Sequence, residues 1–250
     1  MDYYLDTEFL EGTQKKLFGE TKPTIDLISI GIVCEDGREY YAVSKDFNLK
    51  EAWNRYDIKI KQLYGDGRNI YPEGIKTKVY WIRENVLKPI WEDLSWRYIN
   101  SHMFPDIHFQ FSYQSLKELI QLYGETNKQI ADDIERFVLV NYSGVIPIKF
   151  FSYFGDYDWV VFCWLFGKMI DLPKGFPMYC IDLKQTLDEK AENVNPLVFN
   201  TGYKSEFKPN FDNKSKWVKN HPNYPKQVNE HNALSDAKWN KELHNFLKTL

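Results

Sequence analysis

The sequence predicts an α/β protein, and three observations lead to that class. Three β-prone segments follow one another within the first 43 residues. Apolar β-prone segments then alternate with segments of helical periodicity through the second half of the chain. With 250 residues and a hydrophobic content of 43%, the chain can bury a substantial core.

The first strand is predicted over residues 2–10, which include Asp6 and Glu8. Side chains two apart on a strand point to the same face, so these two carboxylates project side by side. Their repulsion is relieved by a divalent cation, because Mg²⁺ and Mn²⁺ prefer oxygen ligands. By itself, the pair is also consistent with an ordinary solvated strand face. A second strand is expected at 25–34, and Asp36-Gly37 predicts a hairpin turn to a third at 39–43.

Residues 48–113 form an aromatic-rich insertion of short helical and loop pieces. A helix is predicted at 79–87, and Pro89 is expected to end it. No linker rich in Gly, Ser or Pro marks either boundary, so we expect a single domain over residues 1–250. A second, polar insertion is expected at 190–229.

The second half of the chain supplies the remaining elements. The segment from Thr126 to Gln129 fits a capping box that begins a helix ending near Asn141. After this helix the sequence predicts a buried strand at 145–154, a helix at 159–169, a strand at 178–183 and a helix at 233–250. The order β-β-β-α-β-α-β-α is that of a ribonuclease H-like fold, in which helices flank a central mixed five-stranded sheet.

Composition excludes several classes of protein. The formal charge of −3 argues against a strongly basic, non-specific nucleic-acid binder. No charge-poor apolar run is long enough to span a membrane, and the acidic N-terminus does not resemble a signal peptide, so we expect a cytoplasmic protein without membrane contact. The three cysteines are widely spaced within apolar runs and are expected to be buried free thiols.

The start of the last predicted helix carries a second group of polar residues. His231 lies just before this helix and Asp236 lies one turn inside it, so the two side chains are expected near each other. The small residues Ala233 and Ala237 allow this end of the helix to approach the sheet closely.

Three motifs in chain order resemble a known family. They are Asp6-Thr7-Glu8-Phe9, the segment 153–159 with sequence YFGDYDW, and the segment 231–237 with sequence HNALSDA. Together they resemble the DEDDh branch of the 3′-5′ exonuclease superfamily, which includes RNase T, oligoribonuclease and polymerase proofreading domains. The likeness is greatest to the small bacterial and phage exoribonuclease-like group of that branch.

The resemblance implies a metal-dependent hydrolase with two Mg²⁺ or Mn²⁺ ions. Asp6, Glu8 and Asp236 would hold one ion, and Asp6 with Asp158 would hold the second. His231 would act as the general base that takes a proton from the attacking water. The expected substrate is single-stranded RNA, or DNA, with a free 3′ end, and the product is a nucleoside 5′-monophosphate.

Further residues of the motifs bear on the substrate. Thr7 and Phe9 resemble residues that contact the terminal ribose and base, although Thr7 also fits an ordinary strand residue and Phe9 a core ring. Of the two central acids, Asp158 fits the family pattern, and Asp156 is expected to cap the helix. Phe154 stands where family members often carry asparagine, so the chain departs from the family pattern at this substrate-contacting position.

Several alternatives remain open from the sequence. A 3′-5′ DNA exonuclease and a catalytically silent nucleic-acid-binding module on the same fold are the competing functions. The stretch from Lys204 to Lys226 interleaves lysines with aromatic residues, as expected either of a lid over a single strand or of a solvated loop. The oligomeric state, including a homodimer, is not determined by any motif.

Overall fold

The computed structural model describes residues 1–13, 22–61, 75–101, 110–194 and 216–250. The chain forms two compact units. The first combines Met1–Ser44 with Glu125–Leu250, and the second is Lys45–Gly124. A single domain over residues 1–250, with insertions at 48–113 and 190–229, stays a prediction.

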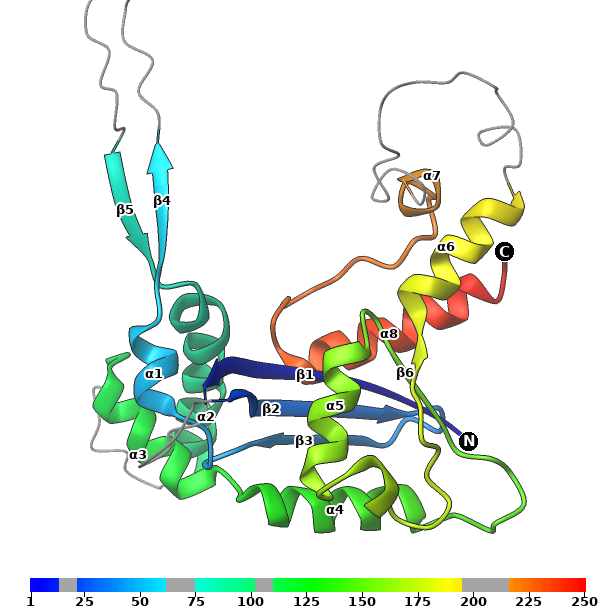
Figure 1. Cartoon of the computed structure of the whole chain (residues 1–250), viewed down its shortest axis with the longest axis horizontal. Coiled ribbons are helices and arrows are strands. Elements are labelled where there is room, and N and C mark those ends of the chain that lie inside the picture. The colour runs from blue at the N-terminus through cyan, green and yellow to red at the C-terminus, as the bar shows by residue number, and fades with distance from the viewer. Residues whose placement is uncertain (14–21, 62–74, 102–109, 195–215) are drawn as a thin grey trace, which may run out of the picture. The chain divides into compact units, whose positions relative to one another are not determined.

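A five-stranded mixed sheet forms the centre of the first unit (Figure 1). The strands lie in the order β3-β2-β1-β6-β7, with bounds β1 Asp2–Thr13, β2 Pro23–Cys34, β3 Glu39–Val43, β6 Lys149–Ser152 and β7 Ile181–Asp182. The first three strands are antiparallel neighbours, whereas β6 is parallel to β1 and β7 is parallel to β6. The predicted α/β class with a mixed five-stranded sheet is confirmed, and the arrangement is compatible with a ribonuclease H-like fold.

Helices cover both faces of this sheet. One face packs against α4 (Asn127–Leu139) and α5 (Asp156–Leu165), and the other against α6 (Leu183–Val194) and α8 (Ala233–Leu247); the short α7 spans Lys216–Lys219. Adjacent strand residues point to opposite faces, so the buried Tyr3 belongs to the first core and the buried Tyr4 to the second. A two-sided core of this kind explains why these strands are apolar at consecutive positions.

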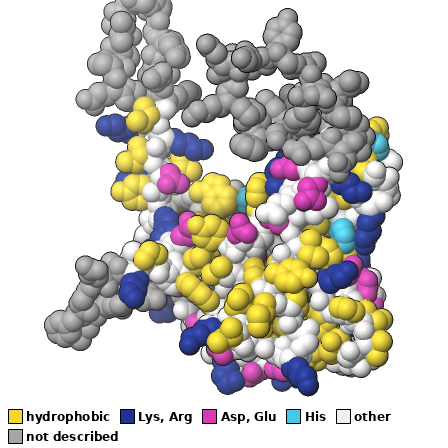
Figure 2. All heavy atoms as spheres, turned by 45° about the vertical axis from the view of Figure 1, so that its right-hand side comes forward, with side chains coloured by type: hydrophobic (Ala, Val, Ile, Leu, Met, Phe, Trp, Pro, Cys, Tyr) yellow, Lys and Arg dark blue, Asp and Glu magenta, His cyan; other side chains and the backbone are white. Residues whose placement is uncertain are grey.

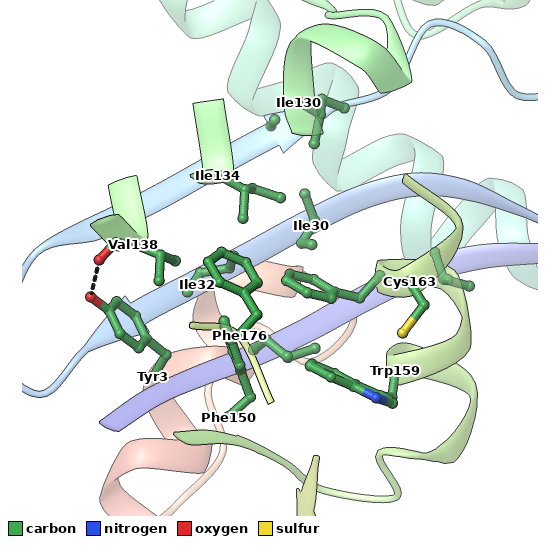
Figure 3. Close-up of a cluster of buried hydrophobic side chains, with 14 of the residues drawn as sticks. Tyr3, Ile30, Ile32, Ile130, Ile134, Val138, Phe150, Trp159, Cys163 and Phe176 are labelled. Carbon is green, nitrogen blue, oxygen red and sulfur yellow. Dashed lines mark hydrogen bonds between the residues drawn. The ribbon is translucent and has the colours of Figure 1, made fainter. Parts of the chain in front are cut away.

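The core beneath α4 and α5 is rich in aromatic rings (Figure 3). The rings of Tyr3 and Phe150 lie 5.5 Å apart between centroids, and Trp159 stacks on Phe162 at 4.9 Å. The buried Tyr3 hydroxyl donates a hydrogen bond of 2.9 Å to the Val138 carbonyl, so its polar end is satisfied. This packing fixes β1 and α5, the two elements that carry Asp6, Glu8 and Asp158.

Local signals correctly located α4, β6, α5 and α8, with differences at their ends. The capping box between Thr126 and Gln129 is present. The strand expected at 145–154 is limited to β6, because Val145 and Ile146 are 82% and 58% exposed and precede the sheet. The last helix ends at Leu247 rather than at residue 250.

Two expectations around the central helix were wrong. Asp156 is the first residue of α5 and not its cap; Gly155 holds the cap position without a side-chain hydrogen bond. The helix also ends at Leu165, earlier than 169, just before the left-handed Gly167 with φ of 109°.

The helix α6 was not predicted. Of the strand expected at 178–183, only Ile181 and Asp182 form β7, and α6 begins at Leu183. Asp182 ends the two-residue β7, and its carboxylate accepts hydrogen bonds from the backbone N–H groups of Lys184 and Gln185 at 2.6 and 3.1 Å. It therefore caps the N-terminus of α6, which satisfies donors that the helix itself leaves free. The prediction that Asp182 is structural agrees with this geometry.

The second unit contains mainly helices. Its elements are α1 (Leu49–Asn54), β4 (Asp57–Lys61), β5 (Ile75–Val79), the π-helical turn η1 (Arg83–Leu87), α2 (Lys88–Ser101) and α3 (Tyr113–Tyr123). The expectation that Pro89 ends a helix is wrong, since η1 runs directly into α2. The wider π-helical turn just before Pro89 accommodates a residue that has no N–H to donate. Trp53 and Trp91 both pack on Phe111, with centroids 5.0 and 5.6 Å away.

Two further predictions concern the whole chain. The three cysteines are free; Cys34 and Cys163 are buried, and Cys180 is partly buried. Among the described residues, every helix is too short or too polar to cross a bilayer.

Candidate active site

The candidate site begins with the two acids of β1. Asp6 lies opposite Gly31 of β2 and Glu8 lies opposite Ser29, so both project from the same face. The pairing with β2 shifts by one residue between Glu8 and Phe9, and such bulges re-aim the side chains beside them. The predicted side-by-side placement of the two carboxylates is present.

A close approach of α8 to β2 adds the third acid. A Cβ at Gly31 would lie 2.3 Å from the Ala233 carbonyl oxygen, so only glycine permits this contact. Ala233 and Ala237 are fully buried, as their small size predicted. One turn into the helix, Asp236 meets the strand acids, and oxygens of Asp6, Glu8 and Asp236 lie within 4.8 Å of one another.

The fourth acid comes from the first turn of α5. Asp158 is only 5% exposed, and one of its oxygens accepts hydrogen bonds from the Thr7 backbone N–H at 3.1 Å and hydroxyl at 2.5 Å. The Ser152 hydroxyl donates to the other oxygen at 2.6 Å. Asp158 is thus oriented by β1 and β6, whereas Asp156 is exposed on the same helical turn. Of the two central acids, only Asp158 lines the same pocket as Asp6, Glu8 and Asp236.

His231 lies at the edge of the same cluster. Its Nδ1 is 3.9 Å from a Glu8 oxygen, and its side chain is 39% exposed. Its backbone has φ of 68°, an unusual conformation for a residue other than glycine, and its N–H donates to Asp236 at 2.8 Å. The turn before α8 therefore places the imidazole beside the acids while leaving it accessible to solvent.

These residues line one open pocket of about 350 Å³. Its lining residues are Asp6, Thr7, Glu8, Phe9, Tyr153, Phe154, Tyr157, Asp158, Gln227, His231, Asp236, Trp239 and Asn240. The rings of Phe9 and Tyr157 are stacked at 5.7 Å between centroids, and Tyr157 is 51% exposed. Phe154, which stands in the place of the family's asparagine, has φ of 58° and is 62% exposed.

Burial and mutual repulsion make the acids hard to ionise together. Burial, followed by the charges of Asp158, Glu8 and Asp236, raises the pKa of Asp6 well above its usual value. Burial and the charges of Asp236 and Asp158 raise the pKa of Glu8 to about 8. Burial also raises the pKa of Asp158 to about 6, against the lowering effect of its hydrogen bonds from Ser152 and Thr7.

The donor set fits a divalent metal ion. Three carboxylates within 4.8 Å offer only oxygen ligands, which is the chemistry that Mg²⁺ and Mn²⁺ prefer. A cation would favour the ionised forms that burial and repulsion now disfavour. Asp158 directs its oxygens to Thr7 and Ser152 and is not within that three-residue group.

Three contributors to the pocket were missed from the sequence. The Gln227 amide donates to Asp236 at 2.6 Å, and the buried Asn240 amide donates to the Leu5 carbonyl at 2.9 Å, which ties α8 to the strand of Asp6. Ser152 orients Asp158. Asn240 could have been found from its position one turn after Asp236 on the same helical face, and Ser152 as a small polar residue in an apolar strand.

The first half of the lysine-rich and aromatic stretch from Lys204 to Lys226 lies outside the described residues. The part that is described begins at residue 216. There, Val218 is buried, and Trp239 donates a 3.1 Å hydrogen bond to the Pro225 carbonyl, so the segment entering the site packs against α8. The choice between a lid and a solvated loop stays a prediction.

The chain is similar to curated 3′-5′ exoribonucleases. Proteins of that name from Mycobacterium tuberculosis, strains CDC 1551 and H37Rv, are each 28% identical to it over 193 residues, which is 76% of this chain and 76% of the relative. No model of a protein family matches the chain. The similarity supports a relationship to 3′-5′ exonucleases that extends over most of the sequence.

Proposed function

We propose that the protein is a metal-dependent 3′-5′ exoribonuclease of the DEDDh type. The observation that carries the proposal is one pocket lined by Asp6, Glu8, Asp158, Asp236 and His231, brought together from three separate parts of the chain. The similarity to curated 3′-5′ exoribonucleases supports both the reaction and RNA as substrate. A catalytically silent relative would be expected to lack one of these five groups.

The acids would hold two Mg²⁺ or Mn²⁺ ions. Asp6, Glu8 and Asp236 would bind one ion, and Asp6 would share the second with Asp158. Bound there, the ions would polarise the phosphodiester and favour ionisation of the attacking water. The hydrogen bonds from Thr7 and Ser152 hold the Asp158 carboxylate in a single orientation.

His231 would move the proton. Its solvent-accessible imidazole accepts a proton from the water that attacks the terminal phosphodiester. The bond from phosphorus to the 3′ oxygen of the preceding nucleotide breaks, and that oxygen takes up a proton. The last nucleotide then leaves as a nucleoside 5′-monophosphate.

The aromatic rings of the pocket suit an unpaired base. The stacked pair of Phe9 and Tyr157, with the exposed Phe154, presents ring faces beside the acids. A base at the 3′ end can stack on such a surface whatever its sequence. Thr7 is only 5% exposed, and its hydroxyl donates a hydrogen bond to Asp158. Its role would therefore be to orient that acid rather than to contact the ribose.

The test is degradation of a 5′-labelled single-stranded RNA and of its DNA counterpart, with Mg²⁺, with Mn²⁺ and with chelator. We expect a metal-dependent ladder that shortens from the 3′ end, faster for RNA. Asp6→Asn should abolish it. A faster DNA reaction would assign a DNA exonuclease instead, and tight RNA binding without cleavage under any metal would assign a binding module.

Asp156→Asn is the matched control. Asp156 lies two residues from Asp158 but is exposed and does not line the pocket. We expect Asp156→Asn to retain the rate and Asp158→Asn to lose it. The reverse result would mean that the central acid has been misassigned.

A further inference from the structure

The second unit carries a two-stranded ribbon with an unusual exposed face. Among the described residues, β4 and β5 form a two-stranded sheet of their own. The two strands extend away from the helices of their unit (Figure 1). In the register of the pair, Ile58 lies opposite Lys78, and Ile60 lies opposite Lys76. Side chains alternate along a strand, so these four share one face. Both isoleucines are 57% exposed, and both lysines are exposed.

This face is basic as well as apolar. Each isoleucine has a lysine as its cross-strand neighbour, and apolar and basic side chains lie together on the ribbon (Figure 2). Within the described part of the ribbon, Asp57 is the only acid, and its position in the alternation places it on the opposite face. A protein partner would favour a continuous apolar surface, whereas this alternation of charge and apolar groups matches a polyanion that also carries apolar rings.

A row of rings and cations continues from the base of the ribbon. Lys78 Nζ lies 4.1 Å from the centre of the Tyr56 ring, and the Tyr56 and Tyr80 rings are 5.8 Å apart. The Arg83 guanidinium lies 3.9 Å from the Tyr80 ring centre and 4.6 Å from that of Trp53. Hydrogen bonds from Arg83 to the Trp53 carbonyl hold it in place. Tyr56 is 43% exposed, so its ring is available at the ribbon end of this row.

We propose that this ribbon face, consisting of Ile58, Ile60, Lys76, Lys78 and Tyr56, is a binding surface for single-stranded nucleic acid. The lysines pair with phosphates, Tyr56 stacks on a base, and the isoleucines contact sugars and base faces. Its residues all belong to the second unit, whereas the acids of the hydrolytic pocket all belong to the first. The inference rests on the proposed function only in taking the bound strand to be the RNA substrate.

The experiment measures binding of a fluorescent 20-nucleotide RNA to the full chain by anisotropy, in chelator, over a range of salt concentrations. Each phosphate contact to a single strand contributes about 0.7 to the slope of log affinity against log salt. Replacing Lys76 and Lys78 together by glutamine should therefore lower that slope by about 1.4. The same relation predicts about tenfold weaker binding near physiological salt. Tyr56→Ala should weaken binding about tenfold with little change of slope.

The matched control is the double variant Lys50→Gln/Lys117→Gln, which removes the same charge from exposed helical positions of the same unit. We expect it to bind as the unaltered protein does. A Lys76/Lys78 variant that matches the control in affinity and in salt slope would overturn the inference. The inference would also be overturned if the unaltered protein were a dimer and the Lys76/Lys78 variant a monomer with unchanged RNA affinity. The ribbon face would then bind a second copy of the chain.

Hydrolysis of a dinucleotide separates this inference from the proposed function. A dinucleotide has a single phosphodiester, which the hydrolytic pocket must hold for cleavage, so the Lys76/Lys78 variant should cleave it at the unaltered rate. The unaltered protein could fail to cleave both the dinucleotide and the 20-nucleotide RNA while Lys76 and Lys78 still determine binding of the longer strand. That result would contradict the proposed hydrolysis and support the ribbon face as a binding surface.

Discussion

Gly31→Ala should separate the acids of the site without altering any of them. The added Cβ would lie 2.3 Å from the Ala233 carbonyl oxygen and 2.4 Å from the Leu234 Cα, both of them backbone atoms. Ordinary contacts of a Cβ begin near 3.4 Å, so the start of α8 must move by about 1 Å. Asp236 lies one turn into that helix and moves with it, away from Asp6 and Glu8.

The expected magnitudes follow from this displacement. Overpacking of a dense core costs about 1 to 3 kcal/mol of unfolding free energy. In a chain of this size, that corresponds to a melting temperature about 2 to 4 °C lower for each kcal/mol. A misplacement of about 1 Å in a catalytic group lowers the rate on the order of 100-fold. Metal affinity should fall with the rate, because one of the three clustered carboxylates is displaced.

Three measurements on the purified variant test this reasoning. They are the urea midpoint in chelator, the affinity for Mn²⁺ by calorimetry, and the rate of RNA shortening. Ser29→Ala is the control, since Ser29 lies two residues earlier on the same face of β2 and its buried hydroxyl has no hydrogen-bond partner among the described residues. A Gly31→Ala protein with unaltered rate and metal affinity would refute the link between this contact and the acidic cluster, whatever its stability.

Three further changes have defined outcomes. Glu8→Gln should stabilise the metal-free protein at pH 7 by about 1 to 3 kcal/mol, because the pKa of Glu8 is raised from 4.5 to about 8. The loss of unfolding free energy caused by the raised pKa of Glu8 grows from pH 4.5 to about pH 8. Urea unfolding in chelator should therefore show the gain of Glu8→Gln at pH 7 and lose it near pH 4. Glu11→Gln, at an exposed position of the same strand, is the control. Thr7→Val removes the hydroxyl donor to Asp158 and should cost about 1 to 2 kcal/mol in urea unfolding, with slower RNA cleavage. Burial lowers the pKa of His244 to about 4, below its unfolded value of 6.5, so its protonation opposes folding as the pH falls through that range. The stability of His244→Phe relative to the unaltered protein should therefore rise between pH 6.5 and pH 4, and a constant difference would contradict this account.

Much of the fold was predictable because its signals are local. Alternation along β1 predicted that Asp6 and Glu8 share a face, and the capping box at Thr126 correctly marked the start of α4. The errors occurred where a neighbour in space overrides the local signal. Pro89 is accommodated by a π-helical turn, and α6 begins where Asp182 supplies a cap instead of continuing the strand.

The sequence by itself determined which chemical groups the candidate site contains, since a carboxylate or an imidazole keeps its chemistry wherever the chain folds. Only the tertiary structure decided which of them meet. The family pattern already favoured Asp158 over Asp156, but the orientation of Asp158 depends on hydrogen bonds from Thr7 and Ser152, and the approach of Asp236 depends on the missing side chain of Gly31. The contacts of Thr7 with Asp158 and of Gly31 with Ala233 join residues far apart in the chain. Their geometry is set by the packing of helices on the sheet, which spacing along the sequence does not encode.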